Sequence, residues 1–314
     1  MGRVNRIVFM GTPDFAVPSL NALVDAGFDV VGVITAPDRR AGRGRTLRPS
    51  PVKEAAQRRG IEVLQPTNLK DPDFQQRLRD LQADLQVVVA FRMLPVAVWD
   101  MPPLGTINLH ASMLPQYRGA APINWVLMNG EPRTGATTFF LQHAIDTGDI
   151  IFREPIDLGP DETAGELHDR LMVLGADLVV RTVRAIDDGQ VPQEPQAHVT
   201  EVKQAPKIDR HTCRIDWTRP AQQVHDHVRG LSPYPAAWTT FDGGTLKILR
   251  TARTDRSTNH TPGTLWAEEG HLFSACERGV VEVLELRPEG KRTLTARDFT
   301  NGFGSGPWRL GEGA

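Results

Sequence analysis

The sequence has few cysteines, no long apolar run and no large excess of one charge. Its 314 residues include 2 cysteines, too few for a disulfide framework or a cysteine-rich zinc site. No apolar stretch approaches the roughly 18 residues that span a bilayer, and the start lacks a secretory signal, so we expect a cytoplasmic protein without membrane contact. The 36 basic and 38 acidic residues give a net charge of −2, which excludes a protein wrapped wholly by nucleic acid but allows a local basic patch.

Two glycine-rich nucleotide-binding fingerprints are also missing. After the first predicted strand, residues 11–16 read Gly-Thr-Pro-Asp-Phe-Ala and keep only the first glycine of the dinucleotide fingerprint. Pro13 removes a backbone N–H group that would hold a pyrophosphate. Because no P-loop run occurs either, the sequence disfavours a nicotinamide dehydrogenase and excludes an ordinary ATPase. A plain strand-to-helix connection with an N-cap explains the same turn.

The first half of the chain alternates between short apolar runs and helical patterns. The predicted strands are residues 7–10, 30–34, 62–64, 85–90, 106–109 and 137–141. The predicted helices are residues 16–26, 52–59, 73–81 and 163–186. Strands separated by helices form right-handed crossovers, so the fold class is α/β, with a Rossmann-like, mostly parallel sheet.

The pattern changes after the long predicted helix. We predict a catalytic domain at 1–188 with a basic insertion loop at 36–52, a polar, proline-containing linker at 189–206, and a second, smaller domain at 207–314. The second domain has a helix near 221–228 and several short strands, at 237–241, 245–249, 263–266 and 280–286. Strands at this spacing suggest a small β-barrel.

The insertion loop is strongly basic and leaves the carboxyl end of the predicted strand 30–34. Its cations are Arg39, Arg40, Arg43, Arg45, Arg48 and Lys53. Only Asp38 opposes them, and Gly42 and Gly44 make the loop flexible. Arginine forks match phosphate geometry, and open α/β sheets bind ligands at this end of their strands. We therefore predict contact with phosphate or nucleic acid; a solvated loop without function is the alternative.

Polar residues at the end of one strand suggest a catalytic site. Asn108 and His110 are two residues apart, so they share a strand face about 6.6 Å from each other. Asp146 follows the predicted strand 137–141 and would face His110 if the two strands are neighbours. An Asn-His-Asp set suits acyl transfer, because the amide stabilises an oxyanion, the imidazole takes or relays a proton and the carboxylate orients the imidazole.

Two other interpretations of these residues stay open. His110 is then an ordinary core histidine, with Asp146 and Asp149 capping a turn. Alternatively, His110, His143 and Asp146 bind zinc, although the spacing of His143 and Asp146 is a common chance pairing.

These motifs resemble the methionyl-tRNA formyltransferase family over nearly the whole chain. The shared segments are residues 11–16, 37–39, 41–44, 49–53, 108–115, 117–123, 146–149, 214–217 and 233–238. The resemblance implies an enzyme that transfers the formyl group of 10-formyltetrahydrofolate to the methionine amine of initiator tRNA in translation initiation. It also implies a monomer that needs no metal, and a second domain that is an OB-type, tRNA-binding barrel.

The resemblance assigns roles to individual residues. The catalytic residues are Asn108, His110 and Asp146, and the folate-binding residues are Ser112, Met113, Leu114 and Pro115. The tRNA-binding residues are Arg39, Arg40, Arg43, Arg45 and Arg48. Residues 90–95 and 139–145 depart from the family's usual spelling, so no pterin contact is assigned at 90–95.

Two alternative functions remain at the level of sequence. Formyltransferases with amino-sugar nucleotide or glycinamide ribonucleotide acceptors share the Asn-His-Asp set, and residues 124–130 are similar to the sugar-nucleotide enzymes, which lack the basic insertion. A non-catalytic RNA-binding protein would use only the barrel and the basic loop, and would not bind folate.

Overall fold

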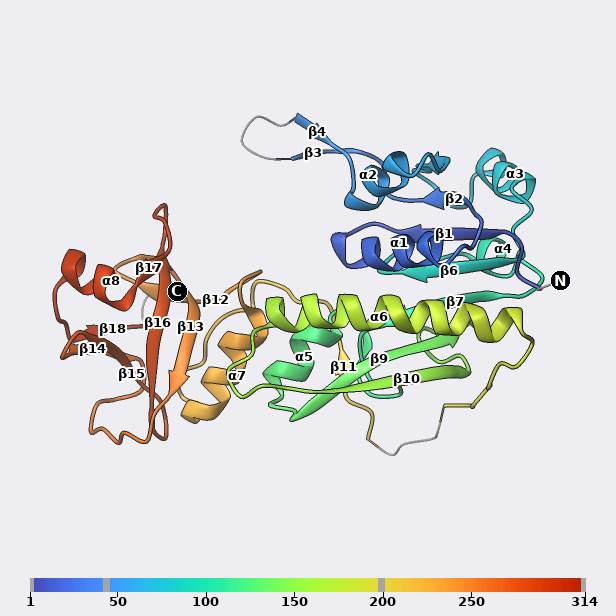
Figure 1. The fold of residues 1–314 in the computed structure, drawn as a ribbon. Helices are drawn as coiled ribbons and strands as arrows, with labels where there is room; N and C mark the ends of the chain where they lie inside the picture. The colour runs from blue at the N-terminus through green and yellow to red at the C-terminus, as the bar shows by residue number, and fades with distance from the viewer. Residues whose placement is uncertain (1–2, 42–45, 197–200, 312–314) are drawn as a thin grey trace. The chain divides into compact units, whose positions relative to one another are not determined.

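The computed structural model describes residues 3–41, 46–196 and 201–311 (Figure 1). The chain forms two compact units that interleave along the sequence. Unit 1 comprises residues 1–118, 135–156 and 168–203, and unit 2 comprises residues 119–134, 157–167 and 204–314. The consecutive domains that the sequence suggests, 1–188 and 207–314, remain a proposal.

Unit 1 is built on a seven-stranded sheet with the order β10-β9-β7-β6-β1-β2-β5. Its strands are β1 (Ile7–Gly11), β2 (Val30–Ile34), β5 (Val63–Leu64), β6 (Leu85–Val89), β7 (Thr106–His110), β9 (Arg133–Phe140) and β10 (Ile150–Asp157). All pairings from β5 through β7 are parallel, whereas β7 and β9 are antiparallel. The predicted mostly parallel α/β sheet is confirmed. β10 was not predicted, because it is an edge strand whose burial fades along its length.

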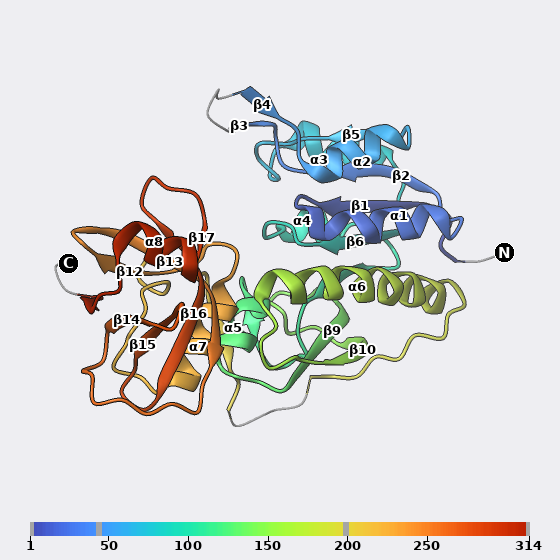
Figure 2. The ribbon, with the colours of Figure 1, turned by 60° about the vertical axis from the view of Figure 1, so that its left-hand side comes forward.

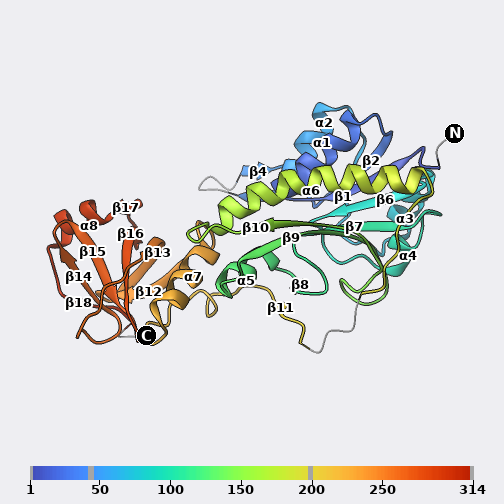
Figure 3. The same ribbon diagram turned by 60° about the horizontal axis from the view of Figure 1, so that its bottom comes forward.

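Helices cover both faces of this sheet (Figure 3). They are the 3₁₀ turn η1 (Asp14–Ala16) and the helices α1 (Val17–Asp25), α2 (Pro51–Arg58), α3 (Pro72–Asp80), α4 (Val96–Trp99) and α6 (Ala164–Asp187). The Ser50 and Asp71 side chains cap α2 and α3, and each helix then begins at a proline. α3 and α4 pack on the face that carries Met10 and Val88.

The opposite face of the sheet lies under α6. Gly175 of α6 approaches Leu109 so closely that a Cβ atom there would lie 2.6 Å from the leucine side chain. The hydroxyl groups of Thr138 and Thr182 also bond across this interface at 2.8 Å. Since strand residues alternate between faces, Asn108 points away from α6. No helix in the described ranges combines the length and apolar surface that crossing a membrane requires.

Unit 2 contains an antiparallel, nearly closed barrel with the strand order β12-β13-β16-β15-β14-β18. The strands are β12 (Ala237–Phe241), β13 (Gly244–Arg253), β14 (Thr264–Glu268), β15 (His271–Ala275), β16 (Val280–Pro288), β17 (Leu294–Thr295) and β18 (Trp308–Arg309). The N–H group of Gly311 donates to Thr240 O at 3.1 Å, which links the two ends of the sheet. The predicted OB-type barrel is confirmed.

Three helices accompany the barrel. α5 (Pro122–Met128) packs against α7 (Ala221–Leu231), and α8 (Ala296–Phe303) lies against β15, β16 and β17 (Figure 2). The sequence analysis predicted α7 but not α5 or α8, which are short and carry no long apolar period. Two short strands, β8 (Arg118–Gly119) and β11 (Gln204–Ala205), form a separate small sheet.

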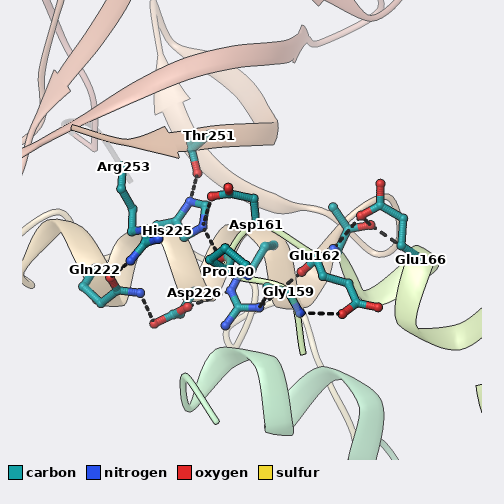
Figure 4. A network of polar contacts seen from close by, with 12 residues as sticks. Gly159, Pro160, Asp161, Glu162, Glu166, Gln222, His225, Asp226, Thr251 and Arg253 are labelled. Carbon is teal, nitrogen blue, oxygen red and sulfur yellow. Dashed lines mark hydrogen bonds and ion pairs between the residues drawn. The ribbon is translucent and has the colours of Figure 1, made fainter. Parts of the chain in front are cut away.

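A buried polar network joins α7 to residues 159–162 (Figure 4). Arg229 pairs with Asp226 at 2.7 Å and donates to the carbonyl oxygens of Gly159 and Glu162. His225 contacts the Thr251 hydroxyl and the carbonyl oxygen of Pro160, and burial lowers the pKa of its imidazole. Buried charges are tolerated only when paired and hydrogen-bonded, so these contacts hold α7 and residues 159–162 in a fixed arrangement.

Candidate functional site

His110 and Asp146 face each other at one end of the unit 1 sheet. β7 and β9 are neighbours, as the sequence argument requires, and Asp146 lies in the loop that follows β9. The Nδ1 atom of His110 is 3.8 Å from Oδ2 of Asp146, and their side chains are only 7% and 13% exposed. A histidine and a carboxylate that share a largely dry site suit proton relay, since their charges interact more strongly there than in water.

The second ring nitrogen of His110 sets the orientation of the imidazole. Nε2 lies 2.8 Å from the carbonyl oxygen of Tyr117. Because a carbonyl only accepts, we assign the Nε2 proton from this contact. In the neutral ring Nδ1 is then the acceptor, and it lies on the Asp146 side. A ring protonated at both nitrogens would meet an acceptor at each, whereas the neutral ring leaves two acceptors facing each other across 3.8 Å.

Asn108 lies on the same face of β7 as His110. It is half-buried, with Val88 of β6 and Phe139 of β9 as its register partners. Within the described part of the chain, its side-chain amide makes no hydrogen bond to another group. A half-buried amide with a free donor is the kind of group that stabilises a developing oxyanion.

Residues 112–115, the predicted folate segment, form a tightly held turn. Thr137 of β9 fixes it twice, because its hydroxyl donates to Ser112 O at 2.7 Å and accepts from Leu114 N at 3.2 Å. The side chains of Ser112 and Leu114 are buried, whereas Met113 and Pro115 are partly exposed. A folate would therefore meet Met113, Pro115 or the turn's backbone. Sequence reasoning missed Thr137, since a threonine in a strand carries no chemical signal of its own.

The Asp146 loop has a restricted shape. Asp146 has a φ of 53°, in the left-handed region. A Cβ atom at Gly148 would lie 1.6 Å from the carbonyl oxygen of Phe140, so only glycine fits. The Thr147 hydroxyl donates to Ala144 O at 3.0 Å. These requirements account for the Asp-Thr-Gly spelling that the sequence shows at 146–148.

The basic insertion is a hairpin where the structure describes it. β3 (Arg39–Ala41) pairs with β4 (Thr46–Arg48) in antiparallel register, with Arg39 opposite Arg48. The two strands were not predicted, because short charged strands lack an apolar pattern. Gly42 and Gly44, from which a flexible loop was expected, lie outside the described residues. Arg43 and Arg45 lie outside the described residues, as does the side chain of Arg40.

The base of this hairpin neutralises one of its six cations. Lys53 pairs with Asp38 at 2.7 Å, and this contact holds the pKa of the Asp38 carboxyl below its usual range. Arg39 and Arg48 are exposed. The pKa of Arg92 is lowered first by burial and then by the positive charge of Arg39. Because like charges opposite each other destabilise a strand pair, a bound phosphate would relieve repulsion here.

Unit 2 has a polar and aromatic depression of about 720 Å³ beside its barrel. Its charged and aromatic lining consists of Asp209, Arg210, Tyr234, Trp238, Lys247, Arg287, Glu289 and Lys291. Tyr234 is 83% exposed, and the Arg210 guanidinium lies 5.1 Å from the Trp238 ring. Cations beside an exposed aromatic ring suit single-stranded nucleic acid. The near-neutral composition of this part of the chain gave no sign of the depression.

The zinc interpretation finds no support in the described residues. No group of three histidine, cysteine or acidic side chains among them lies close enough to hold a metal ion. His143 instead packs edge-on against Trp99, with ring centroids 5.5 Å apart.

Comparison with known proteins relates both units to one family. Residues 5–183 match the profile described as "Formyl transferase", and residues 207–304 match "Formyl transferase, C-terminal domain". The chain is 50% identical over 307 residues to a methionyl-tRNA formyltransferase of Bacteroides fragilis, covering 95% of each chain. It is 46% identical over 302 residues to that of Flavobacterium johnsoniae, covering 95% of this chain and 96% of the other.

Solved structures share the fold at lower identity. An N-formyltransferase from Helicobacter canadensis, in complex with folinic acid and dTDP-3-aminofucose, has a TM-score of 0.69 at 18% identity, covering 89% of this chain and 98% of its own. HypX from Aquifex aeolicus, in complex with tetrahydrofolic acid, has a TM-score of 0.63 at 17% identity, covering 95% and 47%.

Proposed function

The chain belongs to the methionyl-tRNA formyltransferase family and is therefore a transferase; from this premise we propose that it transfers the formyl group of 10-formyltetrahydrofolate to the α-amino group of methionyl initiator tRNA. The observation that carries the proposal is the contact between His110 and Asp146, with Asn108 on the same face of β7 and its amide without a hydrogen bond among the described residues. A cytoplasmic location, a monomeric state and independence from metal remain predictions.

The proposed reaction is a direct transfer without a covalent enzyme intermediate. An α-amino group has a pKa near 8, so roughly a tenth to a fifth of the amine is neutral at physiological pH, which is enough for attack. Its nitrogen attacks the formyl carbon, a C–N bond forms, and the carbonyl electron pair moves onto oxygen. Collapse of this intermediate breaks the bond to N10 of the folate, and the proton lost by the amine ends on the departing nitrogen. Holding the two reactants in line supplies much of the rate.

Three side chains stabilise this path in the proposal. Asn108 donates to the oxyanion from the open face of β7. His110 lies on the same strand face, held through Nε2 by Tyr117 O, and its Nδ1 is the nitrogen that relays a proton. Asp146 supports the cationic form of the ring from 3.8 Å. No nucleophilic serine or cysteine is required.

The tRNA would meet the basic hairpin and unit 2. Arg39 and Arg48 are exposed at the described base of the hairpin, and Arg40, Arg43 and Arg45 extend the same basic segment in the sequence. The depression in unit 2 offers Tyr234 for stacking, and its lining also includes Arg210 and Lys291 for phosphate contact. These are two separate surfaces, one on each unit.

A small acceptor is the principal alternative, and the structure removes the support that residues 124–130 gave it in the sequence. The Asn124 amide donates to Gly230 O at 2.7 Å, and the Trp125 indole donates to Pro206 O at 2.7 Å. Both side chains serve the packing of unit 2, so their likeness to sugar-nucleotide enzymes has a structural explanation. A non-catalytic RNA-binding protein would have no use for the His110–Asp146 pair.

A formyl-transfer assay tests the proposal. Purified protein with 10-formyltetrahydrofolate should formylate methionyl initiator tRNA and leave amino-sugar nucleotides unmodified. Preference for a sugar nucleotide would establish the alternative. Absence of folate binding in a calorimetric titration would instead support the RNA-binding protein.

A further inference from the structure

Gln196 lies beside the loop that carries Asp146. Glu194 and Ile150 exchange both backbone hydrogen bonds, at 2.8 and 3.0 Å, and so form an antiparallel pair at the end of β10. In an antiparallel ladder the next hydrogen-bonded pair lies two residues later in one segment and two residues earlier in the other, which places Gln196 opposite Gly148. The segment after α6 therefore reaches the catalytic loop as an added piece of edge strand.

At this position the Gln196 side chain replaces the backbone ladder. Its Nε2 donates to the carbonyl oxygens of Asp146 at 2.8 Å and Gly148 at 2.9 Å. An amide NH₂ group has two hydrogens, so one side chain serves both carbonyls. This single group therefore holds the backbone of residues 146–148 from one side, including the left-handed conformation of Asp146.

Arg118 fixes which way the amide points. Its Nε and Nη2 donate to Oε1 of Gln196 at 3.2 and 2.5 Å. A guanidinium carries only donors, so the atom that faces it must be the amide oxygen, and the NH₂ group must face the loop. Arg118 follows Tyr117, whose carbonyl oxygen accepts from Nε2 of His110. These adjacent residues thus reach the two members of the pair, Tyr117 by direct contact with His110 and Arg118 through Gln196, which bonds the backbone of Asp146.

We propose that Arg118 and Gln196 are positioning residues that hold Asp146 against His110. This inference rests on the proposed function, in which that pair relays the proton and supports the charged ring. Neither residue needs to touch a reacting atom. Their effect passes through the backbone of residues 146–148 to the Asp146 carboxylate.

Gln196→Glu is the most direct test. It keeps an acceptor for Arg118 but turns a carboxylate oxygen toward two carbonyl oxygens, which should repel the loop. We expect kcat to fall about 100-fold, the effect of misplacing a catalytic group by about 1 Å, with little change in KM for tRNA or folate. Gln193→Glu is the control, because it adds the same charge at an exposed position of the same segment. Its kcat should stay within about twofold of the parent value, since no catalytic group is displaced.

Combination with Asp146→Ala separates positioning from a general structural effect. If Gln196 acts through Asp146, the double variant should be no slower than Asp146→Ala alone. A further loss similar to that of Gln196→Glu in the parent would overturn the proposal. Gln196→Asn and Gln196→Ala, checked by circular dichroism for folding, provide versions without the added charge.

A spectroscopic measurement keeps this inference distinct from the proposed function. The ring resonances of His110 should move in the same direction in Gln196→Glu as in Asp146→Asn, whatever acceptor the enzyme uses. Unmoved resonances would overturn the positioning role even if formyl transfer is observed. Inactive parent enzyme with moved resonances would instead count against the proposed reaction alone.

Discussion

Nδ1 of His110 and a carboxylate oxygen of Asp146 lie 3.8 Å apart on side chains that are largely withdrawn from water. The distance exceeds the roughly 2.7–3.2 Å of an N–H···O hydrogen bond, so the Asp146 loop must move toward His110 before such a bond can form. The distance between the two side chains is set by β7, which carries the histidine, and by the loop after β9, which carries the aspartate.

Loss of any member of the Asn108–His110–Asp146 set should impair turnover without unfolding the protein. Asn108→Ala removes an oxyanion donor and should reduce kcat about 10²–10³-fold. His110→Ala and Asp146→Ala should each reduce it about 10²–10⁴-fold. Steady-state kinetics measure the loss, and thermal melts confirm the fold. Near-normal turnover in all three variants would refute the assignment.

Thr137→Val should disturb the predicted folate segment. It leaves the backbone N–H of Leu114 and the carbonyl of Ser112 without their partner, which costs about 1–3 kcal/mol of stability. The KM for folate should rise several-fold as the turn loosens. Thr134→Val is a matched control on the same strand, because the buried hydroxyl of Thr134 has no hydrogen-bond partner in the described structure. Equal effects at both positions would contradict the role given to Thr137.

Arg39→Ala combined with Arg48→Ala should weaken tRNA as a substrate and leave folate binding unchanged. Each lost phosphate contact reduces the slope of log K against log salt by about 0.7–0.9. Binding titrations at several salt concentrations measure this slope. Arg77→Ala combined with Arg79→Ala, on the exposed side of α3, removes the same two positive charges and is the control. An unchanged slope in the double variant would favour a small acceptor.

The stability of unit 2 should fall as the pH drops below about 6.5. Burial lowers the pKa of His225 in the folded state, so the unfolded chain binds the proton more readily. The stability is complete above the unfolded pKa and is lost as the pH falls toward the folded pKa, with a slope of at most about 1.4 kcal/mol per pH unit for one group. Asp161, Asp226 and Arg229 face the ring, so His225→Asn, which keeps them, should flatten the dependence. An equal slope in that variant, measured by urea unfolding, would exclude His225 as the cause.

Both cysteines should be inert in the native protein. Cys213 and Cys276 are free and buried in the core of unit 2, and burial raises the pKa of the Cys276 thiol to about 12. Labelling with iodoacetamide at pH 8 should therefore wait for unfolding of unit 2. Rapid labelling of the native enzyme would show that this core opens readily.

Much of the parallel sheet, and the placement of Asn108 and His110 on one strand face, followed from pattern alone, whereas the catalytic roles of these residues stay a prediction. Buried strands such as β1 and β2 are nearly continuous apolar runs, and residues two apart in a strand share a face. The sequence did not predict β10, α5 or the hairpin arms, because short or partly exposed elements show little hydrophobic periodicity. Gln196 escaped for a different reason. It acts from a segment that reads as a polar linker, and only the Ile150–Glu194 pairing brings it to the loop.

The interleaving of the two units has a consequence for the order in which the protein can mature. α5 leaves the ribosome long before α7. Met128 of α5 nevertheless packs into the unit 2 core, and the Asn124 amide donates to the carbonyl of Gly230, which is made about a hundred residues later. The packing of α5 therefore stays incomplete until α7 and the barrel strands that follow it have been made. A fragment that starts at residue 207 would carry most of the barrel with an uncovered flank, so proteolytic dissection of this enzyme should not yield two intact halves.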